Sequence, residues 1–84
     1  MIRKEVTVKL KQGINARPAA MLVQAASQFD SEIFIETDNR RMNAKSIMGM
    51  MAISLVPGDS VTITASGADE ETAVSEIGNF LTNA

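Results

Sequence analysis

The residue best suited to chemistry is Ser46, which stands directly before a short apolar run. A serine in this position is typical of a helix N-cap, where its hydroxyl accepts a hydrogen bond from a backbone N–H of the first turn. The pattern predicts a short helix over residues 46–52. A cap hydroxyl can also accept a phosphoryl group, which would meet backbone donors and the positive end of the helix dipole. From this stretch alone, the purely structural role is favoured.

The composition excludes several kinds of chemistry. The 84 residues include no His and no Cys, so imidazole catalysis, thiol catalysis and disulfides are absent. We predict no metal site and no cofactor. The net charge is −2, and there are three Phe but no Trp or Tyr. This balance argues against direct nucleic-acid binding, which requires a basic face and stacking aromatics.

The length and hydropathy bound the architecture. A chain of 84 residues is enough for one domain, which we place at residues 1–84. No apolar run approaches the roughly 20 residues of a membrane span, and the N-terminus lacks a signal-peptide pattern. We therefore expect a cytoplasmic protein that does not enter a membrane.

Hydrophobic periodicity predicts seven elements. Alternating residues predict strands at 2–10, 32–36, 40–43 and 60–66, whereas apolar residues at helical spacing predict helices at about 16–28, 46–52 and 69–81. The order β-α-β-β-α-β-α suggests an α+β fold, in which one face of a four-stranded antiparallel sheet carries three helices. The Pro57-Gly58 pair predicts a turn with positive φ at the glycine.

A second stretch makes the pattern specific. Residues 13–20 read Gly-Ile-Asn-Ala-Arg-Pro-Ala-Ala and resemble the active loop of HPr, the histidine-containing phosphocarrier family of the bacterial sugar phosphotransferase system. Residues 43–49 resemble the regulatory serine site of the same family. The resemblance covers the whole chain in length and element order, and it implies the HPr-like open-faced sandwich.

The departure from the family pattern concerns the carrier residue. The phosphoacceptor histidine of the family falls on Asn15, whose amide nitrogen is delocalised into the carbonyl and is not a nucleophile. The chain is therefore predicted to be neither an enzyme nor a phosphocarrier. Loss of the histidine with retention of the serine resembles the catabolite-repression HPr-like subgroup of this family.

That resemblance implies a regulatory role. HPr kinase/phosphorylase would phosphorylate Ser46 at the expense of ATP, and the product would bind a LacI-type catabolite control repressor as a corepressor. The protein would contact the repressor and not the DNA. Homodimers through exposed edge strands are a further expectation. The partner-contacting positions implied by the family are Arg17, Ala20, Met21, Gln24, Ile47, Met48 and Met51.

Two alternatives remain open at this point. The first is a phosphocarrier HPr: a working carrier would have a histidine at position 15, so this chain with Asn15 would be an inactive or engineered His-to-Asn form. The second is an unrelated small α+β binding module, which would need a basic or aromatic sheet face and would bind RNA in a salt-sensitive manner. The residues expected to point outward are mainly Thr, Ser and Glu with a few Lys and Arg.

Overall fold

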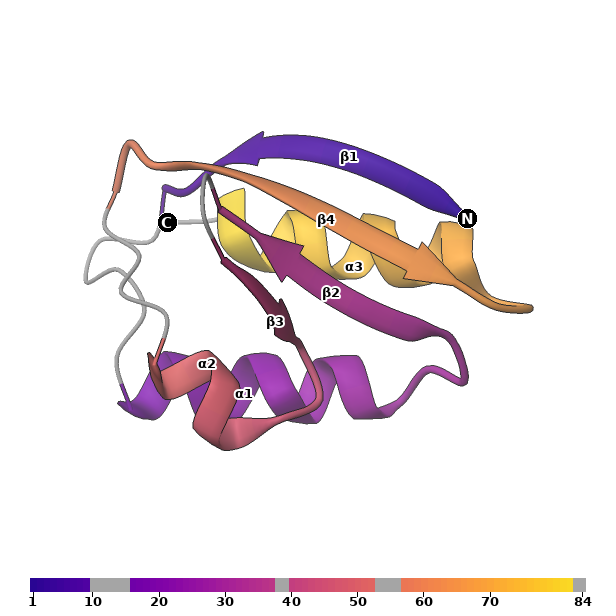
Figure 1. Ribbon diagram of the computed structural model, residues 1–84, viewed down its shortest axis with the longest axis horizontal. Coiled ribbons are helices and arrows are strands. Elements are labelled where there is room, and N and C mark those ends of the chain that lie inside the picture. Colours follow the sequence, from indigo (N-terminus) through magenta and orange to yellow (C-terminus); the bar gives the residue numbers. More distant parts are fainter. Residues whose placement is uncertain (10–15, 38–39, 53–56, 83–84) are drawn as a thin grey trace.

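The computed structural model describes residues 1–9, 16–37, 40–52 and 57–82. Its elements follow the predicted order and confirm the α+β class (Figure 1). They are β1 (Ile2–Thr7), α1 (Ala16–Ser27), β2 (Glu32–Glu36), β3 (Arg41–Asn43), α2 (Ile47–Ala52), β4 (Ser60–Ser66) and α3 (Glu70–Thr82). Within the described ranges, no helix combines the length and apolar character that crossing a bilayer requires.

The four strands form one antiparallel sheet in the order β1-β4-β2-β3. The central strand β4 pairs with β1 through the register Val6↔Val61 and with β2 through Ile35↔Ile63. The last strand in sequence therefore lies inside the sheet, between the edge strand β1 and the inner strand β2.

The three helices cover one face of this sheet. In Figure 1, α3 lies behind β1, β4 and β2, whereas α1 and α2 lie together below the sheet. Every second strand residue points into the layer between them, as the alternation predicts. The core consists of the following buried apolar residues: Val6, Val8, Ala19, Leu22, Ala26, Ile33, Ile35, Ala44, Met50, Val61, Ile63, Ala65, Ala73, Val74, Ile77 and Leu81.

The first strand is shorter than its alternation predicts. It ends at Thr7, and Leu10 lies outside the described residues. Val8 N–H donates to the Asp59 carbonyl at 2.8 Å, and Lys9 N–H donates to the Leu81 carbonyl at 2.9 Å. The backbone therefore leaves the ladder and turns toward the end of α3, although Val8 stays in the core.

The turn before β4 has the predicted geometry. Gly58 has a φ of 101°, a conformation that side chains with a Cβ rarely adopt. Its N–H donates to the Val8 carbonyl at 2.8 Å. The predicted turn at residues 38–39 and the continuation beyond α2 at residues 53–55 lie outside the described residues.

Gly78 in the middle of α3 generates a stability prediction. A Cβ at this position would lie 3.8 Å from Ile63 Cδ1 and 3.8 Å from Val6 Cγ1, which is ordinary van der Waals contact. Because alanine is favoured over glycine in a helix interior by up to about 1 kcal/mol, Gly78→Ala should raise the free energy of unfolding by roughly that amount. Urea denaturation measures it.

Gly67→Ala is the matched control, because there a Cβ would lie only 2.6 Å from Ser31 Oγ and 2.7 Å from Ser31 Cα. That variant should be less stable than the native chain. A Gly78→Ala variant that is also destabilised would show that α3 packs more tightly on the sheet than these distances indicate.

Candidate phosphorylation site and contact surface

The approach to α2 is fixed by a turn between β3 and the helix. Asn43 Oδ1 accepts a hydrogen bond from Lys45 N–H at 2.8 Å, and the Asn43 carbonyl accepts one from Ser46 N–H at 3.1 Å. A side chain that bonds a backbone group two residues on is an Asx-turn, which asparagine favours. The turn reverses the chain direction and presents Ser46 at the start of the helix.

Ser46 is the N-cap of α2, as predicted. Its Oγ accepts a hydrogen bond from Gly49 N–H at 3.1 Å, and its carbonyl accepts the first helical bond from Met50 N–H at 2.9 Å. The residue is half-buried. A Cβ on Gly49 would lie 3.4 Å from Ser46 Oγ, so the glycine leaves this side of the hydroxyl uncrowded.

Lys45 anchors the turn to the neighbouring helix. Its ammonium Nζ donates to the Phe29 carbonyl at 2.6 Å, just beyond the end of α1. A cation at the C-terminal end of a helix is favoured by the helix dipole. The bond holds the Ser46 turn against the end of α1, and sequence reasoning missed it because the two residues are 16 positions apart.

The apolar residues of α2 divide between the core and the surface. Met50 is fully buried, whereas Ile47, Met48 and Met51 are 40%, 81% and 54% exposed. A helix of two turns has one buried side, and Met50 takes it together with Ala44 in the preceding turn. The three residues that the family resemblance implies as partner contacts are therefore open to solvent beside Ser46.

Helix α1 contributes the other implied contact positions. Met21 is 51% exposed and Gln24 is exposed, whereas Ala20 is half-buried. Arg17 lies in the first turn of α1, one turn before Ala20 and Met21 at helical spacing. Its side chain and the whole of Asn15 lie outside the described residues. Because α1 packs against α2, the two sets of positions belong to adjoining helices.

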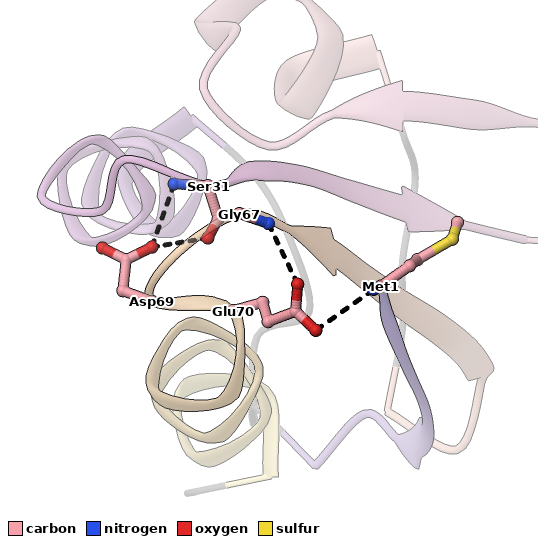
Figure 2. A network of polar contacts seen from close by, with 5 residues as sticks. All are labelled: Met1, Ser31, Gly67, Asp69 and Glu70. Atoms are coloured by element: carbon pink, nitrogen blue, oxygen red, sulfur yellow. Dashed lines mark hydrogen bonds and ion pairs between the residues drawn. The ribbon is translucent and has the colours of Figure 1, made fainter.

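A polar network joins the start of α3 to the segment between α1 and β2 (Figure 2). One Asp69 carboxylate accepts hydrogen bonds from Asp30 N–H at 2.9 Å, from Ser31 N–H at 3.0 Å and from the Ser31 hydroxyl. These donors, the Ser31 hydroxyl first, hold the pKa of Asp69 below its ordinary value. Sequence reasoning did not predict these contacts, because Asp30 and Ser31 lie 39 and 38 positions before Asp69.

Glu70 completes this network. Its carboxylate accepts a hydrogen bond from Gly67 N–H at 3.1 Å and lies 3.1 Å from the Met1 ammonium (Figure 2). The Gly67 N–H, and then the ammonium, keep the pKa of Glu70 below its ordinary value. The bond from the Gly67 N–H, three residues earlier, gives this backbone donor a partner in the turn that leads into α3.

The sheet face that carries no helices is occupied by charge pairs over one aromatic ring. The Arg41 guanidinium lies 3.9 Å from the centroid of the Phe34 ring, and Glu36 pairs with Arg41 at 3.3 Å and with Arg3 at 3.5 Å. Thr64 points to this face, as predicted, yet it is 1% exposed, because Arg3 and Phe34 stand opposite it in the register. The stacked Arg41 covers a face of the ring, which disfavours base stacking there.

Comparisons with known proteins agree on one family. The family described as the PTS HPr component phosphorylation site matches residues 2–83. The HPr-like protein Crh of Halalkalibacterium halodurans is 48% identical over 81 residues, which cover 96% of this chain and 96% of that protein. The phosphocarrier protein HPr of Treponema pallidum is 46% identical over 83 residues, which cover 99% of this chain and 94% of that protein.

Solved structures give the same answer for the fold. The crystal structure of a phosphocarrier protein HPr from Bacillus anthracis superposes with a TM-score of 0.91 at 45% identity, covering 95% of each chain. The crystal structure of Crh from Bacillus subtilis, described as a swapped dimer, has a TM-score of 0.76 at 43% identity and covers 96% of this chain and 93% of that chain. The predicted fold is thereby confirmed.

The cap hydrogen bond of Ser46 gives a second prediction. Ser46→Ala removes the acceptor for Gly49 N–H and should lower the free energy of unfolding by about 1 kcal/mol. Ser46→Asp is the matched control, because aspartate caps helices as well as serine does, and it should keep most of the native stability. Equal stability of the alanine variant and the native chain in urea denaturation would contradict the capping role.

The Asp69 network predicts a pH dependence. Because the pKa of Asp69 is lowered in the native state, the unfolded chain binds more protons in acid. The ionised Asp69 carboxylate therefore contributes to the free energy of unfolding at pH values above the ordinary aspartate pKa of about 3.9. This contribution is lost as the pH falls through the lowered pKa of Asp69 in the native state. Asp69→Asn should therefore lower stability at pH 7 and flatten its fall in acid, as measured by urea denaturation from pH 7 to pH 2.

The matched control is Glu71→Gln, which removes an exposed carboxylate from the same turn of α3. This variant should keep the acid dependence of the native chain. If Asp69→Asn and Glu71→Gln behave alike, the hydrogen bonds to Ser31 contribute nothing that depends on the charge of Asp69.

Proposed function

Because the chain belongs to the HPr family, whose members are phosphocarrier and regulatory proteins and not enzymes, we propose that it is a regulator switched by phosphorylation of Ser46. The single observation that carries this proposal is the absence of histidine from the sequence. Asn15 stands where the resemblance puts the phosphocarrier histidine, and an amide cannot accept and pass on a phosphoryl group. The serine site, in contrast, is complete.

The surroundings of Ser46 support its role as a phosphoacceptor. The side chain is only half-buried, and its hydroxyl accepts the Gly49 N–H, a donor that a phosphate oxygen can use in the same way. Phosphorylation adds roughly −1.5 to −2 charge at pH 7. Because Lys45, Ala44 and Met50 anchor the turn and helix independently of the hydroxyl, the fold is retained and the main change is at the surface.

The proposed partners are HPr kinase/phosphorylase, which adds and removes the phosphoryl group, and a LacI-type catabolite control repressor, which binds the phosphorylated form. The exposed side chains of Ile47, Met48 and Met51 would supply apolar contact area, and the phosphate would pair with Arg or Lys of the repressor. On α1, the positions of Arg17, Ala20, Met21 and Gln24 extend this surface. The acidic chain contacts the repressor in the cytoplasm and leaves DNA binding to it.

The second candidate function is that of a phosphocarrier HPr whose histidine has been replaced. The observation in its favour is the 46% identity to the phosphocarrier protein of Treponema pallidum, nearly the same as the identity to Crh. In that case the chain would still dock on the carrier's phosphoryl donor, but Asn15 would prevent transfer.

Homodimers are a further part of the proposal. The Crh structure of Bacillus subtilis is described as a swapped dimer, and this chain places β1 and β3 at the two edges of its sheet, where unpaired backbone groups favour strand exchange or pairing.

The proposal is tested by measuring repressor binding before and after phosphorylation. The chain phosphorylated by HPr kinase/phosphorylase with ATP should bind a LacI-type catabolite control repressor at least about tenfold more tightly, because one charge-assisted pair contributes about 1.4 kcal/mol or more. Isothermal titration calorimetry gives both affinities. Ser46→Ala, treated identically, is the control and should show no gain.

Equal affinity of the phosphorylated and unphosphorylated chains for the repressor would contradict the proposed switch. Gain of affinity in the Ser46→Ala control would show that the kinase acts at another residue.

A further inference from the structure

Methionine thioethers are unusually open to solvent on the two adjoining helices. Met48 is 81%, Met51 54% and Met21 51% exposed, whereas Met50 in the same short helix is fully buried. The chain has no Cys, so methionine supplies all of its sulfur. An exposed thioether reacts with oxidants, whereas close packing excludes them from a buried one.

We propose that Met48, Met51 and Met21 form an oxidation-sensitive site, through which peroxides weaken the contact surface of this protein. In each reaction a sulfur lone pair attacks one oxygen of hydrogen peroxide, so that an S–O bond forms as the O–O bond breaks. Proton transfer then releases water. The thioether is oxidised by two electrons to the sulfoxide and the peroxide is reduced by two.

The fold tolerates this change because the reacting side chains do not hold α2 in place. The helix is anchored by Met50 and Ala44 in the core and by the Ser46 cap. Oxidation of Met48 or Met51 alters side chains that already face water. A sulfoxide is polar and chiral, so removing it from water costs free energy when a partner covers it without offering a hydrogen bond. The consequence falls on binding and not on stability.

The site lies where an effect on binding is greatest. Among the described residues, five large apolar side chains are exposed, and three of them belong to the six residues of α2. Met48 follows Ser46 by two positions. Phosphorylation of Ser46 adds an anion that attracts a partner, whereas oxidation of Met48 removes apolar area beside that anion. The two modifications therefore act in opposite directions on one surface.

The oxidation itself is tested on the unmodified chain by peptide mass mapping during treatment with hydrogen peroxide. Met48, Met51 and Met21 should acquire one oxygen each, and Met50 should react at least about tenfold more slowly because the chain must open locally to expose it. The exposed Met1, held near Glu70 at the start of α3, is an internal reference. Oxidation of Met50 at the rate of Met48 would overturn the proposal.

The regulatory effect rests on the proposed function and is tested with the chain phosphorylated before peroxide is added. Binding to the LacI-type repressor should weaken by roughly tenfold and recover after treatment with methionine sulfoxide reductases. The triple variant Met21→Leu, Met48→Leu and Met51→Leu should keep its own untreated affinity after peroxide, because leucine has no thioether to oxidise. Met50→Leu, a volume-conserving change in the core, should leave the sensitivity in place.

The outcomes separate the two proposals. Repressor binding that is present without peroxide and unchanged after it would overturn the regulatory inference and leave the proposed function intact. Absence of binding by the untreated phosphorylated chain would overturn the proposed function and its oxidative control together, while the mass map still decides whether the methionines form an oxidation site.

Discussion

Helix α2 has six residues, so it can bury one side and must expose the other. The buried side takes Met50, and the exposed side takes Ile47, Met48 and Met51. Its start is fixed by the Ser46 cap and by the bond from Lys45 to the end of α1. A helix of this length is not stable alone, so contacts with the rest of the chain hold it in place. It presents the Ser46 hydroxyl next to the exposed apolar side chains of α2.

This arrangement separates the proposed phosphorylation site from the core. The core and the sheet ladder do not involve the Ser46 hydroxyl, so charge can be added there without repacking the interior. The Asp69 network lies at the start of α3 and joins it to the segment before β2 through Ser31 (Figure 2). Figure 1 shows that α2 and the start of α3 lie on different parts of the molecule. A change at Ser46 therefore leaves the hydrogen bonds of Asp69 in place.

Much of the fold follows from local patterns. The bounds of β4 are predicted correctly because its alternation is flanked by Pro57-Gly58 and by Gly67, and the cap of α2 is predicted because serine before an apolar run has a local meaning. The bonds of Asp69 to Ser31 and of Lys45 to Phe29 are not predicted. They join residues 38 and 16 positions apart, and such pairs are determined by how the elements pack.

In the candidate site, too, local patterns predict some features, whereas others depend on how the elements pack. Hydropathy indicates that a two-turn helix cannot bury all its apolar residues, but it does not say that Met50 goes inward while Met48 goes outward. Thr64 alternates to the outer face as expected, yet Arg3 and Phe34 on the neighbouring strands enclose it. Burial on a sheet depends on the residues opposite, which the sequence of one strand does not contain.

The central claim is that this chain is a phosphorylated switch and not a phosphoryl carrier. The most direct measurement is intact mass after separate incubation with HPr kinase/phosphorylase plus ATP and with the phosphoryl donor enzyme of the sugar phosphotransferase pathway. We expect one added phosphoryl group from the kinase and none from the donor enzyme, with Asn15→His as the control that accepts a phosphoryl group from the donor enzyme. A native chain that takes no phosphoryl group from the kinase, or takes one from the donor enzyme, would contradict it.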